Sequence, residues 1–204
     1  MDKKRPAQAK KGLVVFINGS PGTGKSTLAI KLADRLNVDT ILQTDLLKEM
    51  WKSGGDTFLA SHCSHDVWKI MGKATKKNVL TGFNLLTNEY RGTIIRIIKS
   101  YQSVGKSLIV EGVQATPQIF SEIKTKNKIG IYLEILPKKQ QFARFEMKNR
   151  HMKVKNKLWY ENYDCIKLID KYEKHHARMG NFFLVKNRNI DDTVSKIVNY
   201  LTQC

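Results

Sequence analysis

The sequence predicts a three-layer α/β domain, in which a parallel sheet is covered by helices on both of its faces. Short apolar runs rich in β-branched residues recur along the chain, and segments with apolar residues at helical spacing separate them. The runs are continuous rather than alternating, which is typical of strands buried on both faces. A length of 204 residues suits one hydrophobic core, so we expect one domain rather than two.

The first strand and helix have the clearest patterns. Residues 13–17 form an apolar run flanked by glycines, and residues 24–36 carry their apolar side chains on one helical face. A short strand is expected over 40–42 and a helix over 45–51, which a pair of glycines ends. Residues 56–78 are polar and aromatic without a clear period, so we predict irregular structure there.

The second half of the chain repeats this alternation. A longer helix over 83–101 leads into a buried-strand pattern at 107–112, which ends in an acid and a glycine. Another strand is expected at 129–135, because Pro137 stops the run that precedes it. The remaining expected elements are helices at 138–150 and 162–178, a strand at 182–185 and a helix at 190–201.

Composition narrows the classes of partner. The chain has 36 Lys and Arg against 18 Asp and Glu, and the net charge of +18 favours polyanions, phosphorylated metabolites or anionic membranes as partners. No apolar run approaches the ~18 residues that a membrane-spanning helix needs. The three cysteines form no C-x-x-C pair, which favours a reducing, cytoplasmic setting over a disulfide framework.

The first residues differ in composition from the rest. Residues 1–12 are rich in lysine and lack the apolar stretch of a secretory signal. We therefore expect a flexible basic arm at 1–12, followed by a single domain over 13–204.

The strongest chemical signal is a glycine-rich loop between the first strand and the first helix. Residues 19–26 match the phosphate-loop pattern G-x-x-x-x-G-K-[ST] in full. Glycines let backbone N–H groups converge on phosphate oxygens, and the helix N-terminus adds partial positive charge. A chance glycine turn would lack the flanking strand and helix. The expected nucleotide-binding residues of the loop are Gly19, Ser20, Pro21, Gly22, Thr23, Gly24, Lys25, Ser26 and Thr27.

The loop side chains have distinct expected roles in a P-loop NTPase. Lys25 would bridge the β- and γ-phosphates as a catalytic residue, the Ser26 hydroxyl would bind Mg²⁺, and Thr27 could bond an α-phosphate oxygen. No guanine-reading N-K-x-D motif is present, and the chain is short for a motor domain. A small-molecule kinase that uses ATP and Mg²⁺ is therefore the leading class.

Two acids follow predicted strands, where strand ends near a phosphate loop face the ligand crevice. Asp45 could orient or deprotonate the acceptor hydroxyl as a catalytic residue, or it could cap the helix that follows. Glu111 could assist Mg²⁺ directly or through water, or it could be a structural carboxylate. Lys48, one helical turn after Asp45, could bind an acceptor anion or be solvated. We expect Asp45, Lys48 and Glu111 to contribute to substrate binding.

A strongly basic segment follows the strand at 129–135. Residues 138–157 contain eight lysines and arginines and one glutamate, which predicts a basic lid over the phosphates. Arg144 is the candidate for stabilising the transferred phosphoryl group and Arg150 for binding the nucleotide, because guanidinium can bridge phosphate oxygens. Most of the lysines fit a solvated helix equally well. The aromatic residues at 159, 160 and 163 are expected to pack the base of the lid.

Histidines and cysteines do not form a standard metal site. His62, Cys63 and His65 lie close together in sequence, but their spacing fits no standard zinc motif and no second pair completes it. Trp51 and Trp68 are expected to be packing residues. The sequence therefore predicts no metal site apart from Mg²⁺ at the phosphate loop.

Taken together, the motifs resemble those of the 2-phosphoglycerate kinases, which are P-loop kinases related to the adenylate and shikimate kinase group. The resemblance implies phosphorylation of the 3-hydroxyl of 2-phosphoglycerate by ATP and Mg²⁺, giving 2,3-bisphosphoglycerate. It runs in order from about residue 13 to 185. The motifs that carry it are the phosphate loop and residues 44–48, 64–68, 111–117, 144–145 and 159–166.

Two other functions are kept open. The acceptor could be the 5′-hydroxyl of a nucleoside, nucleotide or polynucleotide, because a charge of +18 suits a phosphodiester backbone. Against this, no RNA-binding motif of interleaved glycines and aromatics is present. The second alternative is a non-catalytic, nucleotide-dependent protein that binds RNA or a membrane surface. The favoured partners are ATP and a small anionic substrate.

Overall fold

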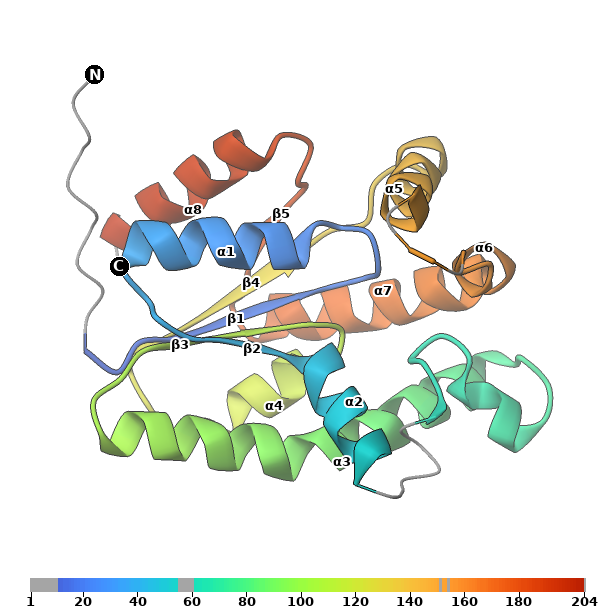
Figure 1. Ribbon diagram of the computed structural model, residues 1–204, viewed down its shortest axis with the longest axis horizontal. Coiled ribbons are helices and arrows are strands. Elements are labelled where there is room, and N and C mark those ends of the chain that lie inside the picture. Colours follow the sequence, from blue (N-terminus) through green and yellow to red (C-terminus); the bar gives the residue numbers. More distant parts are fainter. Residues whose placement is uncertain (1–10, 55–60, 151, 154, 204) are drawn as a thin grey trace.

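A computed structural model of the chain describes residues 11–54, 61–150, 152–153 and 155–203. Its centre is a five-stranded sheet with the order β2-β3-β1-β4-β5, and every neighbouring pair of strands is parallel (Figure 1). This confirms the predicted α/β class with a parallel sheet. The strands are β1 (Val14–Gly19), β2 (Ile41–Gln43), β3 (Leu108–Glu111), β4 (Lys128–Leu133) and β5 (Phe183–Val185).

Helices cover both faces of the sheet, as predicted. Helices α1 and α8 lie side by side on one face, and α3, α4 and α7 lie on the other (Figure 1). The helices are α1 (Lys25–Leu36), α2 (Thr44–Ser53), α3 (Lys76–Ser103), α4 (Pro117–Ser121), α5 (Lys138–Arg150), α6 (Leu158–Glu161), α7 (Tyr163–Met179) and α8 (Ile190–Gln203), together with the 3-10 helix η2 (Val67–Met71). None of the helices in the described residues is long and apolar enough to cross a membrane.

The central strand explains why the apolar run at 13–17 is continuous. In β1, Val14 and Phe16 pack into the core beneath α3 and α4, whereas Val15 and Ile17 pack into the core beneath α1 and α8. All four side chains are fully buried. Successive side chains of a strand point to opposite faces, so a strand covered on both sides needs no polar positions.

Several helical segments of the described chain were not predicted, or were predicted too short. Helix α3 begins at Lys76 rather than 83, because the Thr75 hydroxyl caps it by accepting from the Asn78 N–H at 3.2 Å. The segment predicted to be irregular thus contains the start of α3 and all of η2. The short helix α4 has its own signal, a Thr116 cap followed by proline at the first helical position.

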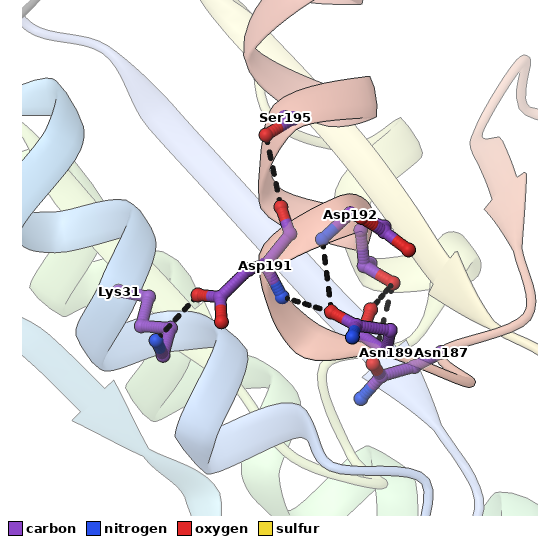
Figure 2. Close-up of polar contacts among 7 residues, drawn as sticks. Lys31, Asn187, Asn189, Asp191, Asp192 and Ser195 are labelled. Atoms are coloured by element: carbon purple, nitrogen blue, oxygen red, sulfur yellow. Dashed lines mark hydrogen bonds and ion pairs between the residues drawn. The ribbon is translucent and has the colours of Figure 1, made fainter.

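Polar contacts join α8 to α1 and fix the turn that precedes α8. The Lys31 ammonium pairs with the Asp191 carboxylate at 2.6 Å (Figure 2). The Asn189 side chain accepts from the backbone N–H groups of Asp191 and Asp192 at 2.9 and 3.1 Å, which caps the helix. The same turn carries Asn187, which reaches the phosphate loop at the carboxyl edge of the sheet.

Candidate active site

A cavity of about 910 Å³ opens at the carboxyl ends of β1, β2 and β3. The phosphate loop, α2, the segment at 62–65 and α5 form its walls, so it brings together segments that are distant in sequence. Most of the residues selected from the sequence lie on its wall, namely Pro21, Gly22, Gly24, Lys25, Ser26, Thr27, Asp45, Lys48, Glu111 and Arg144. Gly19, Ser20, Thr23 and Arg150 do not line it.

The phosphate loop depends on its glycines for shape and for the close approach of α5. Gly22 and Gly24 have φ values of 76° and 93°, in the left-handed region that favours glycine, and α1 begins directly after Gly24. A Cβ atom on Gly22 would lie 2.7 Å from Nε2 of Gln141 on α5. The Gln141 amide also donates to the Pro21 carbonyl. The glycine therefore lets the lid helix pack directly against the loop.

Lys25 is buried at the start of α1. Its Nζ donates to the Ser20 carbonyl of its own loop at 3.0 Å. Burial lowers the pKa of Lys25, while the negative charges of Glu111 and Asp45 oppose this shift. The lysine is thus held among two carboxylates at the mouth of the loop, where it can reach phosphate oxygens.

Ser26 and Glu111 form a hydrogen-bonded pair of oxygen-bearing side chains near Lys25. The Ser26 hydroxyl donates to Oε1 of Glu111 at 2.8 Å, and Glu111 is the buried last residue of β3. No group of three His, Cys, Asp or Glu side chains suited to a metal occurs in the described part of the chain. A hydroxyl and one carboxylate fit Mg²⁺, which takes its other ligands from water and substrate phosphates.

The expectation that Asp45 caps a helix is wrong. Helix α2 begins at Thr44, so Gln43 occupies the cap position and no side chain caps the helix there. Thr44 is fully buried because its hydroxyl turns inward to donate to Oε1 of Gln114 at 3.3 Å. Asp45 therefore lies in the first turn of α2 and is exposed on the cavity wall. Its negative charge interacts favourably with the partial positive charge of the helix N-terminus.

Arg144 connects α5 to the phosphate loop. Its Nη1 donates to the Thr23 carbonyl at 2.9 Å, and its Nη2 donates to the Asn187 carbonyl. Burial lowers the pKa of this guanidinium. The Asn187 amide donates to the same Thr23 carbonyl at 3.0 Å, so an arginine and an asparagine fix one peptide of the loop.

The structure brings Lys148, rather than Arg150, to the cavity. Lys148 lines the wall and lies over the Trp159 ring at 5.1 Å, whereas Arg150 is exposed and pairs with Glu146 at 3.3 Å. The helical period explains the difference. Position 148 is four residues after Arg144 and shares its face, while position 150 is six residues after it and points elsewhere. The periodicity was a signal available in the sequence.

The aromatic residues after the basic segment pack against α5. Phe145 and Trp159 are buried, with their ring centroids 5.3 Å apart, and Tyr163 joins the same cluster. Tyr160 packs edge-on against Phe145 at 5.6 Å. The cluster ties α5 to α6 and α7, which positions Arg144 and Lys148 at the cavity.

Beneath the loop lies a buried polar cluster that sequence reasoning missed. The Ser20 hydroxyl and the Tyr132 hydroxyl both donate to Oδ1 of Asp170, at 3.1 and 2.9 Å. One helical turn along α7, Glu173 accepts from the Gln118 amide at 3.1 Å. Burial raises the pKa of Asp170, and it raises the pKa of Glu173 to about 8. Charged residues of an amphipathic helix are expected to face solvent, so the sequence did not indicate that Asp170 and Glu173 point inward.

Three further segments, distant in sequence, contribute to the cavity wall. Lys48 of α2 donates from Nζ to the Cys63 sulfur at 3.3 Å, and His65 and Tyr90 of α3 line the same wall. Burial and the charge of Asp45 raise the pKa of Tyr90, so this phenol stays protonated. Of these four residues, the sequence analysis selected only Lys48 for substrate binding.

Comparison with known proteins finds several sequence relatives of this chain. No family model matches the sequence. A 2-phosphoglycerate kinase of Methanocaldococcus jannaschii is 22% identical over 204 residues, which cover 98% of this chain and 66% of that protein. A 2-phosphoglycerate kinase of Pyrococcus horikoshii is 26% identical over 213 residues, covering 98% of this chain and 67% of that protein. This chain thus spans about two thirds of the length of these relatives.

Solved kinases share the fold at low sequence identity. Shikimate kinase from Acinetobacter baumannii superposes with a TM-score of 0.50 at 18% identity, covering 94% of this chain and 93% of the other. Deoxyadenosine kinase from M. mycoides gives a TM-score of 0.51 at 14% identity and covers 94% and 100%. The comparisons confirm the predicted P-loop kinase fold and the resemblance to 2-phosphoglycerate kinases.

Proposed function

We propose that this chain transfers the γ-phosphate of ATP to a hydroxyl group of a small anionic metabolite, with 2-phosphoglycerate as the first candidate and 2,3-bisphosphoglycerate as its product. The observation that supports the proposal is the shared cavity. A phosphate loop with Lys25 forms one wall, and Asp45 and Lys48 lie on the wall of the same cavity. Relatives named 2-phosphoglycerate kinase favour this acceptor over others.

The nucleotide end of the cavity would be served by the loop. Backbone N–H groups and the start of α1 would bind the phosphates, and Lys25 Nζ would leave the Ser20 carbonyl for the β- and γ-phosphate oxygens. Ser26 and Glu111 would hold Mg²⁺. The bound ion supplies positive charge that offsets the charge developing on the phosphates.

The acceptor end would be served by Asp45. Its carboxylate would accept the proton of the acceptor hydroxyl while that oxygen forms a bond to the γ-phosphorus. The bond from the γ-phosphorus to the bridging oxygen breaks as ADP leaves. Asp45 suits this role because it is exposed on the cavity wall. It also lies close enough to Lys25 for its negative charge to raise the pKa of that lysine.

The lid would supply positive charge to the transferred group. Lys148 lines the cavity and forms no ion pair with a carboxylate of the described residues, and its positive charge lowers the pKa of Lys25. Arg144 stays a candidate for the same role, through its place on the wall and its hold on the Thr23 carbonyl. An arginine in this position would also keep the loop in its phosphate-binding shape.

Substitution of the loop lysine tests the proposal. Production of ADP is measured for the wild-type chain and for Lys25→Ala with ATP, Mg²⁺ and a panel of acceptors that includes 2-phosphoglycerate, 3-phosphoglycerate, glycerate, nucleosides and an oligonucleotide. We expect acceptor-dependent turnover of 2-phosphoglycerate that Lys25→Ala lowers by about a thousandfold or more, since the lysine acts on the transferred group.

The control is Lys31→Ala, which removes an exposed lysine of the same helix that pairs with Asp191 away from the cavity. This variant should retain turnover within about twofold, because an exposed ion pair contributes only about 0–1 kcal/mol to stability. Full activity of Lys25→Ala, or wild-type turnover confined to the oligonucleotide, would contradict the proposal.

A further inference from the structure

His65 is held in place by a short turn that uses its neighbours. The Asp66 carboxylate accepts from the Cys63 N–H at 2.6 Å, and the Cys63 carbonyl accepts from the Asp66 and Val67 N–H groups at 3.1 and 3.0 Å. The Trp68 indole donates to the His65 carbonyl at 3.0 Å. Val67 is fully buried in the core next to α3. The turn therefore fixes the backbone that presents His65.

The imidazole of His65 is buried but forms no hydrogen bond within the described part of the fold. Its side chain is 3% exposed, and neither ring nitrogen has a hydrogen-bond partner among the residues that the structure describes. Buried polar groups are nearly always paired, because an unpaired one loses its hydration without compensation. His65 also lines the cavity, so the ring that carries these unpaired nitrogens borders the space that a bound molecule would fill.

Burial, more than any neighbouring charge, determines the protonation state of His65. Burial lowers its pKa to about 4, the charges of Lys48 and Lys69 act in the same direction, and Asp66 opposes them. At neutral pH the ring is therefore uncharged, with one N–H donor and one acceptor nitrogen. A neutral donor beside the Lys48 ammonium suits an oxygen that carries negative charge.

The positions of Asp45 and Lys48 limit the ligand. They are three residues apart on α2, so their side chains start about 5–6 Å apart on one helix face. Lys48 Nζ lies 3.3 Å from the Cys63 sulfur, which brings it to the turn that carries His65. A molecule with its reacting hydroxyl at Asp45 would thus place a group about one helical turn away, beside Lys48 and His65.

We infer that His65 is a specificity-determining residue, which donates a hydrogen bond from its neutral ring to an anionic oxygen of the acceptor that Lys48 also binds. The inference rests on the proposed function and narrows its substrate class. The acceptor is a small hydroxy acid or phosphomonoester whose hydroxyl and anionic group lie about 5 Å apart. A nucleoside carries no anion near its 5′-hydroxyl, so it would leave this pair of donors unused.

Kinetics of two variants test the inference. His65→Leu removes both ring nitrogens, and His65→Gln keeps a donor and an acceptor of similar reach. For His65→Leu we expect the KM for 2-phosphoglycerate to rise about tenfold to a hundredfold, with kcat and the KM for ATP within about threefold of wild type. His65→Gln should recover most of the loss. His65→Leu should unfold at or above the wild-type temperature, since the leucine removes an unpaired buried polar group.

A purely structural histidine would behave differently. Its replacement by leucine would lower the unfolding temperature and leave the KM for 2-phosphoglycerate unchanged. If the wild-type chain turns over 2-phosphoglycerate and His65→Leu has an unchanged KM, the inference is overturned while the proposed function stands.

A binding measurement separates the inference from turnover. The full chain labelled with ¹⁵N-histidine is titrated with 2-phosphoglycerate, and the His65 ring signals are assigned by their loss in His65→Gln. We expect both ring ¹⁵N signals to shift at saturation, the donor nitrogen most. If no acceptor is turned over, the proposed function fails. This titration alone then decides whether His65 contacts bound 2-phosphoglycerate. Ring signals that stay fixed at saturating 2-phosphoglycerate would overturn the inference.

Discussion

The two walls of the cavity are built in opposite ways. The phosphate loop is one contiguous segment, and its polar groups bond within the protein, since Lys25 donates to the Ser20 carbonyl and Arg144 of α5 donates to the Thr23 carbonyl. The proposed acceptor wall is assembled from α2, the segment at 62–65 and α3. It holds a buried histidine without a partner in the described residues. The difference suggests that phosphate binding is encoded locally, whereas acceptor choice depends on tertiary structure.

The largest effect is expected at Asp45, where the two walls meet. Asp45→Asn keeps the size of the side chain but cannot accept the hydroxyl proton, so kcat should fall by about a hundredfold to ten-thousandfold. The KM for ATP and the unfolding temperature should change little, because Asp45 is exposed on the cavity wall. Steady-state kinetics and thermal unfolding check both statements.

Asp34→Asn is the matched control, since Asp34 is an exposed carboxylate on α1 that does not line the cavity. It should leave kcat within about twofold. A kcat for Asp45→Asn within threefold of wild type would remove Asp45 from the chemistry and move the acceptor away from α2.

A smaller effect is expected for the matched pair Arg144→Lys and Arg150→Lys. A lysine at 144 cannot join the Thr23 and Asn187 carbonyls as the guanidinium does, so kcat/KM for ATP should fall by about tenfold. Within the described part of the chain, the exposed Arg150 forms an ion pair with Glu146 alone, and its substitution should change kcat/KM by less than twofold. Equal losses in the two variants would show that the lid reaches the nucleotide with a different face.

The smallest effect concerns the cluster beneath the loop. Burial raises the pKa of Glu173 to about 8, so the folded chain keeps a proton that the unfolded chain releases above about pH 4.5. The free energy of unfolding should therefore fall as pH rises from about 4.5 to 8, by at most about 1.4 kcal/mol per pH unit from this group. Glu173→Gln should lose this slope. Urea unfolding of both chains at pH 5.5, 6.5 and 7.5 measures it, and parallel slopes would contradict the assignment.

Several features of the fold follow from local sequence. The continuous run at 13–17 predicts a strand buried on both faces because Val14 and Val15 each meet a separate core. The phosphate loop is predictable because its glycines and Lys25 are adjacent in sequence. The aromatic base of the lid is predictable because Trp159 and Tyr163 follow the basic helix directly.

Other features depend on contacts that no local pattern contains. Helix α2 starts at Thr44, whose hydroxyl donates to the side chain of Gln114, a residue 70 positions away in the sequence. Asp170 lies inward because Ser20 and Tyr132 supply donors from other strands and loops. His65 lines the cavity because of where its turn lies in the fold, and the residues next to it in sequence do not indicate that position. Lys148 is a different case, since the helical period placed it with Arg144.

The most direct test of the account is a ³¹P NMR time course of the wild-type chain with ATP, Mg²⁺ and 2-phosphoglycerate. The account predicts that ADP and a second phosphomonoester signal on the acceptor grow in equal amounts, with no free phosphate beyond that of ATP alone. Loss of ATP that yields only inorganic phosphate, or that is independent of 2-phosphoglycerate, would contradict transfer to this acceptor.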